Sequence, residues 1–326
     1  MSKSQTPPGR SPIPSYKPQL AKLVQDPPEG DDWLHEMKFD GYRIGCRIDG
    51  QSVKLISRTG KEWTAAFPEI CDAARKLGVR RALLDGEVAM LLPDGRTSFQ
   101  ALQNVFTGSS RRGLVYFAFD LLHVEGRTLM RRPLEERKNE LLRLIGKPRA
   151  RGRLRYSEHV IGKGANLFAE ACRLHMEGIV SKRRDSAYTP GRGNTWFKTK
   201  CVMRQEFVIG GFTDPEGSRQ GIGALLIGYY DDRRRLVFAG KVGTGFSVTS
   251  ARDLRQRLER LERRDPAFRP PPAEKRARWV KPSLVAEVAF TEWTGDGKIR
   301  HPSFQGLRRD KSPADVRRED AAPTRS

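Results

Sequence analysis

The 326-residue chain has few cysteines and no long apolar segment. Its four cysteines, Cys46, Cys71, Cys172 and Cys201, form no C-x-x-C pair, which excludes a zinc ribbon and argues against a disulfide framework. We expect reduced, mostly buried thiols. No apolar run approaches the roughly 20 residues that span a bilayer, and the first 15 residues contain no apolar core of a secretory signal. These absences predict a cytoplasmic protein that does not enter a membrane.

The sequence also lacks the common phosphate-binding loops. No G-x-x-x-x-G-K-[ST] motif occurs, because Gly60-Lys61 and Gly146-Lys147 have neither the upstream glycine nor the following Ser or Thr. Gly221-Ile222-Gly223 is only a fragment of a dinucleotide fingerprint and is better explained as a turn between strands. If the protein uses a nucleotide, it does so without a P-loop.

Positive charge is in clear excess. The chain has 61 Lys and Arg against 39 Asp and Glu, a formal net charge of +22. Such an excess is typical of a protein that meets a polyanion, with nucleic acid first. A non-catalytic architectural or DNA-end-binding protein would need the same charge, so charge alone does not separate an enzyme from a binding protein.

The apolar pattern changes near Cys201. Before it, alternation at 42–48, an Asp-Gly turn and a second run at 53–57 predict a β-hairpin. A second hairpin is predicted at 82–92 with the following Pro-Asp-Gly, and a buried strand at 115–122. Helices are predicted from Pro133 to Gly146 and through 167–174.

Beyond Cys201 the chain is dominated by short apolar strands. They are predicted at 207–212, 223–230, 236–242 and 284–290, and one helix with Leu254, Leu258 and Leu261 interrupts them. Strands of this length joined by glycine-rich turns favour an oligonucleotide-binding β-barrel. We expect an α+β protein with a disordered tail at 1–15, an antiparallel-sheet domain at 16–201, a barrel domain at 202–312 and a disordered tail at 313–326.

The most informative segment is 36–43, Glu-Met-Lys-Phe-Asp-Gly-Tyr-Arg. Lys38 at a strand edge, followed by Asp-Gly, has the form of an amine nucleophile held in a tight turn. Taken alone, K-x-D-G is a weak signal, because an exposed turn lysine would explain it better. Further polar segments follow in order along the chain: Ser57–Gly60, Leu84–Val88, Phe117–Asp120, Glu177–Lys182, Arg192–Lys200 and Arg308–Lys311.

With these segments in this order, the sequence resembles the covalent nucleotidyltransferases, and most closely the ATP-dependent DNA ligases of the bacterial DNA ligase D type. The resemblance extends from about residue 20 to about residue 313. It implies a nucleotidyltransferase (adenylation) domain followed by an oligonucleotide-binding barrel. It also implies that Lys38 attacks the α-phosphorus of ATP, that AMP passes to a 5′-phosphate, and that a 3′-hydroxyl displaces it to seal the strand. RNA ligases and mRNA capping guanylyltransferases share K-x-D-G and remain alternatives.

The resemblance assigns a role to each candidate site residue. Lys38 is catalytic, and the implied ATP- or AMP-binding residues are Glu36, Arg43, Arg58, Glu87, Phe119, Arg192, Lys198 and Lys200. Glu36 would meet the adenine edge and Phe119 would stack on the base, with Phe117 as the ordinary core ring. Glu87 and Glu177 would bind Mg²⁺ or Mn²⁺, because such ions prefer hard oxygen ligands.

A free lysine is a poor nucleophile at neutral pH, because its pKa is about 10.4. We therefore expect the cationic side chains of Arg192, Lys198 and Lys200, together with the metal ion, to lower the pKa of Lys38.

Arg308, Asp310 and Lys311 match the terminal R-x-D-K motif of the family, which is implied to orient pyrophosphate in the first step. This motif lies on the barrel domain, whereas its target is bound by the other domain. The barrel is therefore expected to swing between a position closed over ATP and one that meets DNA. Arg309 stands where close relatives usually have an acid.

The implied partners are nicked or broken duplex DNA and, by family analogy, the bacterial end-binding protein Ku. We expect no DNA-binding domain before residue 20 and no attached polymerase or nuclease domain. We expect a compact, monomeric two-domain enzyme at the bacterial nucleoid, active in DNA repair or non-homologous end joining.

Overall fold

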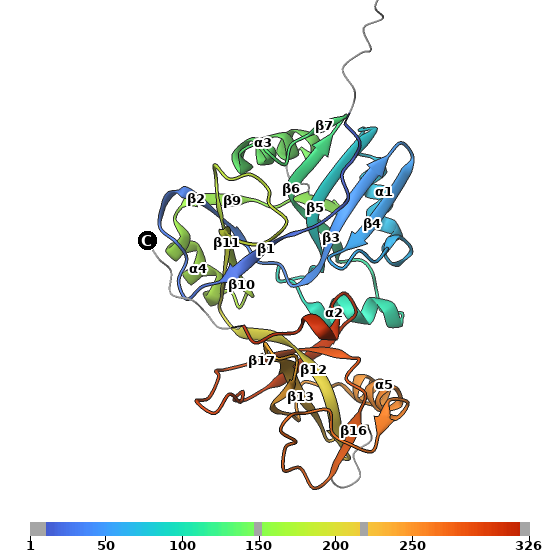
Figure 1. The fold of residues 1–326 in the computed structure, drawn as a ribbon. Coiled ribbons are helices and arrows are strands. Elements are labelled where there is room, and N and C mark those ends of the chain that lie inside the picture. The colour runs from blue at the N-terminus through green and yellow to red at the C-terminus, as the bar shows by residue number, and fades with distance from the viewer. Residues whose placement is uncertain (1–10, 147–151, 216–220, 320–326) are drawn as a thin grey trace, which may run out of the picture. The chain divides into compact units, whose positions relative to one another are not determined.

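The structure is a computed structural model that describes residues 11–146, 152–215 and 221–319 (Figure 1). The chain divides into two compact units between Cys201 and Val202. Both units combine helices with mainly antiparallel sheets, so the predicted α+β class is confirmed. No helix of the described residues is long and apolar enough to cross a bilayer.

The first unit contains two sheets. One has the strand order β1-β11-β10-β2-β9, formed by Gln19–Leu23, Gly191–Lys200, Gly178–Arg183, Gly30–Met37 and His159–Gly162. The other has the order β4-β3-β5-β6-β7, formed by Ser52–Ser57, Gly41–Asp49, Arg81–Met90, Leu114–Val124 and Arg127–Thr128, with β8 (Leu154–Tyr156) beside β6. The β1–β11 and β6–β8 pairs are parallel and the others in these sheets are antiparallel.

In the described part of this unit, four α-helices and two short 3-10 helices accompany the sheets: η1 (Thr64–Ala66), α1 (Pro68–Arg75), α2 (Phe99–Asn104), η2 (Val105–Thr107), α3 (Leu134–Ile145) and α4 (Gly164–Arg173). Every residue of β6 is buried, because this strand lies inside its sheet and α3 packs on it. A continuous apolar core joins β3, β5 and β6 to α1 and α2 and includes Tyr42, Leu84, Phe99 and Tyr116. This core holds β3, β5 and β6 in place.

Several predicted elements are confirmed in this unit, and one is shorter than predicted. The hairpin β3–β4, strand β6 and helices α3 and α4 all form where the sequence predicts them. The second hairpin is short, because most of β5 pairs with β3 and β6 instead. At the end of β5 the chain folds back: Leu91 and Thr97 form a bridge, and the N–H of Ser98 donates to the carbonyl of Met90 at 3.0 Å. The returning segment ends at Ser98, which caps the first turn of α2.

The second unit is built around β12, which pairs with β13, β16 and β17. Its elements are β12 (Met203–Thr213), β13 (Ala224–Tyr230), β14 (Leu236–Val242), α5 (Val248–Glu259), β15 (Glu262–Arg263), β16 (Ala277–Val280), β17 (Val285–Phe290), β18 (Ser303–Arg308) and η3 (Pro313–Asp315). The four predicted strands and the predicted helix are confirmed. β16 and β18 were not predicted, because they are short and carry no clear apolar alternation.

The expectation of disordered tails is wrong for the described part of each end. Ile13 is buried, and its carbonyl accepts a hydrogen bond from Arg47 at 3.0 Å. Val316 is fully buried, and its carbonyl accepts from the N–H of Tyr230 at 3.0 Å. One buried apolar residue, Ile13 in the first segment and Val316 in the last, holds an otherwise polar segment against the fold. Composition does not show which residue will be buried. Residues 1–10 and 320–326 lie outside the described residues.

The cysteines also differ from expectation. Cys172 in α4 and Cys201 after β11 form a disulfide with their Cα atoms 5.1 Å apart. The prediction of four thiols is therefore wrong for this pair, because α4 packs against β10 and Cys201 follows β11, the strand that pairs with β10. Cys46 and Cys71 are buried free thiols, as expected.

Candidate active site

Lys38 lies on the connection between the two sheets of the first unit. β2 ends at Met37 and β3 begins at Gly41, so the chain crosses from one sheet to the other at Lys38. The Lys38 N–H donates to the carbonyl of Gly178 at 2.9 Å, and its Nζ donates to Oε2 of Glu177 at 2.6 Å. Lys38 and Glu177 therefore meet because they stand at adjacent ends of the neighbouring strands β2 and β10.

The Asp-Gly pair after Lys38 fixes this connection. The Asp40 N–H donates to the hydroxyl of Thr97 at 2.9 Å, and its carboxylate accepts from the N–H of Phe99 at 3.2 Å. Gly41 has no room for a side chain, since a Cβ there would collide with the carbonyl of Val88. Asp40 thus ties the connection to the start of α2, and Gly41 lets β3 lie close against β5.

Carboxylates, not cations, dominate the surroundings of the Lys38 ammonium. Burial alone would lower the pKa of Lys38, but the charges of Glu177 and Glu87 outweigh it and hold that pKa above its ordinary value. The cationic side chains of the protein alone therefore do not lower the pKa of Lys38, and the part expected of the metal ion stays a prediction. The reason is the direct contact with Glu177, which the order of motifs along the chain does not reveal.

Strand register brings Glu87 to the same place. Glu87 of β5 lies between Arg43 of β3 and Phe117 of β6 in one cross-strand row. The ring of Phe117 stacks on that of Phe39, with centroids 3.9 Å apart and planes 8° from parallel. Phe117 is buried, as expected for a core ring, but it stacks on the residue next to Lys38.

Arg43 is held by a buried carboxylate. Its Nε and one terminal nitrogen each donate to Asp85 at 2.6 Å. Asp85 also accepts from the hydroxyls of Tyr16 at 2.8 Å and Tyr188 at 2.6 Å. The Arg43 guanidinium carbon lies 4.3 Å from the ring centroid of Phe119. Arg43 and Phe119, both predicted to contact the nucleotide, therefore already pack against each other in the structure.

Glu36 is the acceptor in a second buried network. Its carboxylate accepts from Lys138 at 2.6 Å, from Lys182 at 3.0 Å and from the hydroxyl of Ser157 at 2.9 Å. Burial would raise the pKa of Glu36, but the two ammonium groups outweigh it and lower that pKa. Burial lowers the pKa of Lys182 to about 8, although Glu36 opposes the shift.

Lys182 connects the two residues predicted to bind adenine. Its ammonium bonds to Glu36 and lies 4.3 Å from the ring centroid of Phe119 and 4.3 Å from a ring of Trp196. Glu36 and Phe119 come from different sheets, so the structure brings them together through this lysine. Lys182 and Trp196 belong to segments quoted from the sequence, but neither received a role there.

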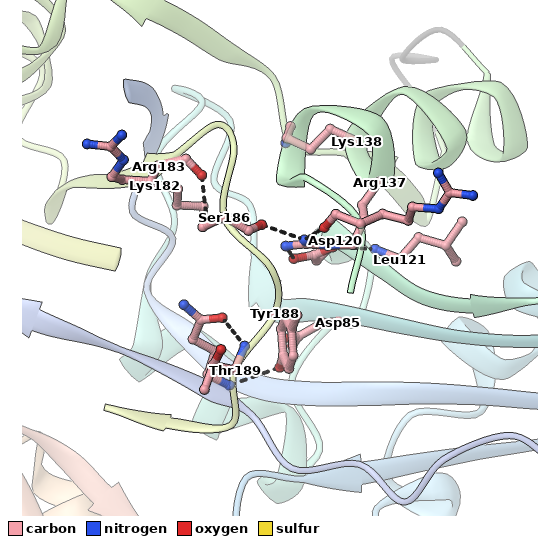
Figure 2. A network of polar contacts seen from close by, with 12 residues as sticks. Asp85, Asp120, Leu121, Arg137, Lys138, Lys182, Arg183, Ser186, Tyr188 and Thr189 are labelled. Carbon is pink, nitrogen blue, oxygen red and sulfur yellow. Dashed lines mark hydrogen bonds and ion pairs between the residues drawn. The ribbon is translucent and has the colours of Figure 1, made fainter. Parts of the chain in front are cut away.

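A neighbouring ion pair supports this network (Figure 2). Arg137 of α3 donates to both oxygens of Asp120 at 2.8 and 2.9 Å and to the carbonyl of Ser186 at 2.8 Å. Arg137 and Asp120 are completely buried. Arg137 and Lys138 were missed as site-supporting residues, although both lie at helical spacing from Leu134 and Leu141 on the apolar stripe of α3. A cation on such a stripe is a signal for a buried partner.

The remaining predicted residues are spread more widely. Lys200 lies opposite Gly178 in the β10–β11 pair and Lys198 lies opposite Val180, so both are one strand away from the Lys38–Glu177 pair. Arg192 is exposed at the other end of β11, six residues and about 20 Å along the strand from Lys198. Arg58 is half-buried in the turn after β4. Arg308, Asp310 and Lys311 belong to the second unit.

The carboxylates at Lys38 suit a divalent cation. The described residues contain no group of three or more His, Cys, Asp or Glu arranged to hold a metal ion by themselves. Glu177 and Glu87 both attract the Lys38 ammonium and offer hard oxygen ligands. Mg²⁺ is commonly held by one or two carboxylates together with substrate phosphates, so this pair fits the ion.

The chain belongs to the family of ATP-dependent DNA ligases. Residues 17–200 match the ATP dependent DNA ligase domain, and residues 218–311 match the ATP dependent DNA ligase C terminal region. The family recognised from the sequence is thereby confirmed, and so are its nucleotidyltransferase and oligonucleotide-binding domains. Family membership also favours a DNA ligase over a capping enzyme.

Similar proteins carry names from DNA end joining. The multifunctional non-homologous end joining protein LigD of Pseudomonas aeruginosa is 43% identical over 320 residues, 96% of this chain and 38% of that protein. The multifunctional non-homologous end joining DNA repair protein LigD of Mycobacterium tuberculosis is 38% identical over 296 residues, 89% of this chain and 38% of that protein. The chain thus spans well under half the length of these relatives.

A solved structure described as mycobacterial DNA ligase D complexed with ATP and MES shares the fold. The two sequences are 35% identical, and the match covers 93% of this chain and 98% of the chain in that structure, with a TM-score of 0.69.

Proposed function

We propose that this chain seals breaks between a 3′-hydroxyl and a 5′-phosphate in duplex DNA, using ATP and a lysyl-AMP intermediate on Lys38. The observation that carries the proposal is the Lys38 ammonium, held 2.6 Å from Glu177 and attracted by Glu87 on a connection fixed by Asp40 and Gly41. A lysine held among carboxylates at a sheet junction, inside a family of ATP-dependent ligases, is suited to covalent transfer of AMP.

The first step forms a bond between Lys38 Nζ and the α-phosphorus and breaks the bond from that phosphorus to pyrophosphate. Lys38 has to lose a proton to attack, and Glu177 Oε2 is the carboxylate within hydrogen-bond reach of that proton. Glu87 and Glu177 would hold Mg²⁺ or Mn²⁺, which neutralises negative charge on the phosphates. Lys198 and Lys200, one strand away, would contact the α-phosphate.

Glu36, Phe119 and Lys182 form the proposed adenine pocket. Support comes from the Lys182 ammonium, which touches both Glu36 and the Phe119 ring. A base that stacks on Phe119 would take the place of a cation now beside the ring. Arg43, Arg58 and Arg192 are proposed to reach ribose, phosphate or the nick.

Arg308, Asp310 and Lys311 are proposed to orient the pyrophosphate. Because they belong to the second unit, the two units would have to close around ATP during self-adenylation and rearrange for DNA. The later steps release no pyrophosphate. Lys311→Ala should therefore fail to self-adenylate but still seal a nick that already carries a 5′-adenylate, whereas Glu177→Ala should be impaired in both reactions.

The biological setting proposed is double-strand-break end joining at the bacterial nucleoid, with the chain acting as a monomer. Support comes from the names of the relatives from Pseudomonas and Mycobacterium. Broken duplex DNA is the proposed substrate, and a Ku protein is the proposed recruiting partner.

The direct test is strand sealing with matched substrates. Purified protein with ATP and Mg²⁺ should join a nicked DNA duplex and should not need a second protein to do so. The same assay with nicked RNA, and a guanylyl-transfer assay with GTP, separate the RNA ligase and capping alternatives. Faster joining of RNA than of DNA, or an adduct formed with GTP but not with ATP, would contradict the proposal.

A further inference from the structure

The second unit contains an unusual pair of acidic residues beneath its R-x-D-K motif. Glu206 of β12 lies directly opposite Glu287 of β17 in an antiparallel pair. Directly opposed residues project from the same face of a sheet, and like charges at such positions destabilise it. The side chains are only 14% and 9% exposed, so water screens them poorly. Two carboxylates at this position therefore need cationic partners.

The motif supplies those partners. Lys311 Nζ lies 2.8 Å from Glu206, and a terminal nitrogen of Arg308 lies 2.8 Å from Glu287. Arg308 also donates to both oxygens of Asp310, at 2.8 and 2.7 Å. Lys311 thus contacts Glu206, Arg308 contacts Glu287 and is attracted by Glu206 as well, and Asp310 connects the strand end to the turn that carries Lys311.

We propose that Glu206 and Glu287 are positioning residues for the pyrophosphate-orienting motif. This inference rests on the function proposed above for Arg308 and Lys311. Glu287 holds the Arg308 guanidinium, and through Asp310 it sets the path of the turn. Glu206 holds the Lys311 ammonium directly. An ammonium has three N–H donors, so Lys311 can keep its bond to Glu206 while it donates to a phosphate oxygen.

Glu206 is expected to speed self-adenylation because it holds the Lys311 side chain in one orientation. A lysine side chain on a turn has several rotamers, and fixing one of them after ATP binds would cost entropy in the transition state. Glu206 fixes the ammonium beforehand. Misplacing a catalytic contact by about 1 Å can cost roughly 100-fold in rate. We therefore expect Glu206→Ala to lower the single-turnover rate of self-adenylation at saturating ATP by about 10- to 100-fold.

The conservative variant separates positioning from folding. The amide oxygen of Glu206→Gln still accepts a hydrogen bond from Lys311, so this variant should recover part of the rate lost in Glu206→Ala. Sealing of a pre-adenylated nick involves no pyrophosphate and should stay within about twofold of the parent protein for both variants. Glu292→Ala is the matched control, because Glu292 is an exposed glutamate of the same unit paired with Arg300 at 3.0 Å.

A double mutant tests the route of the effect. If Glu206 acts through Lys311, Glu206→Ala should lower self-adenylation no further in a Lys311→Ala background. Additive losses would overturn the inference, and so would equal losses of self-adenylation and pre-adenylated sealing in Glu206→Ala. Unchanged self-adenylation in Glu206→Ala beside a large loss in Lys311→Ala would also overturn it, while the pyrophosphate role of Lys311 would stand. Full self-adenylation by Lys311→Ala would show that Lys311 does not orient pyrophosphate, and the inference about Glu206 would then fail as well.

Discussion

At the scale of single residues, the site is organised by buried carboxylates that collect several donors each. Asp85 accepts from Arg43, Tyr16 and Tyr188, while Glu36 accepts from two lysines and a serine. The sequence could identify Lys38 and its neighbouring motifs, because residue types and order are visible in it. It could not show that Lys38 would contact Glu177, because that contact depends on strand register.

Asp85→Asn should destabilise the protein strongly. Asp85 is completely buried and Arg43 largely so, and removing one partner of such a pair leaves an uncompensated charge that costs about 3–5 kcal/mol. Urea unfolding measures the change. The control is Asp72→Asn at an exposed pair with Arg75, where a change of about 0–1 kcal/mol is expected. Similar values for the two variants would show that the Asp85 network does not stabilise the fold.

At the scale of elements, the strands were easier to predict than their pairing. Alternation and a turn located β3 and β4, and a continuous apolar run located β6. The parallel β1–β11 pair and the docking of 11–15 depend on contacts between distant segments. Hydrophobic periodicity located α3 and α4, whereas α2 was missed because its six residues carry too little pattern. The N-cap at Ser98 was its only local signal.

The β2–β10 pair should make stability depend on acid pH. His35 of β2 is completely buried and its Nδ1 is hydrogen-bonded to Ser181 of β10 at 2.8 Å, and burial lowers its pKa from 6.5 to about 4. Because the folded-state pKa is the lower one, the unfolded chain binds more protons between pH 6.5 and 4. Stability from this residue is therefore present above pH 6.5 and lost as the pH falls through that window, by at most about 3 kcal/mol.

Urea unfolding between pH 4 and pH 7 checks this prediction. His35→Gln should unfold with a shallower pH dependence than the parent protein, because its side chain does not titrate. His175→Gln is the control for replacing a histidine by glutamine, since His175 is exposed after α4. An unchanged slope in His35→Gln would show that His35 does not carry the acid sensitivity.

At the scale of the whole molecule, the net charge of +22 overstates the charge available to DNA. Arg137, Lys138 and Lys182 are buried cations with carboxylate partners, and Arg308 is a largely buried one. Arg111 is likewise bound to a carboxylate, with Glu69 at 2.5 Å. The remaining surface cations are the ones expected to meet phosphates, and composition alone could not separate the two groups.

Binding to nicked duplex DNA should weaken steeply with salt. The logarithm of affinity should fall linearly with the logarithm of salt concentration, with a slope of about −0.9 for each phosphate neutralised. Fluorescence anisotropy with a labelled nicked duplex across a salt series gives this slope. A slope near zero would mean that the surface charge is only solvated and does not contact the DNA backbone.

The central claim is that Lys38 carries AMP, and α-labelled ATP tests it most directly. Incubation with a divalent metal ion should give a labelled protein whose bond acid destroys and alkali spares, as expected for a phosphoramidate, and peptide mapping should place the label on Lys38. Lys38→Ala should lose the label, whereas Lys54→Ala, which removes an exposed lysine paired with Glu62, should keep it. Full labelling of Lys38→Ala would contradict the account.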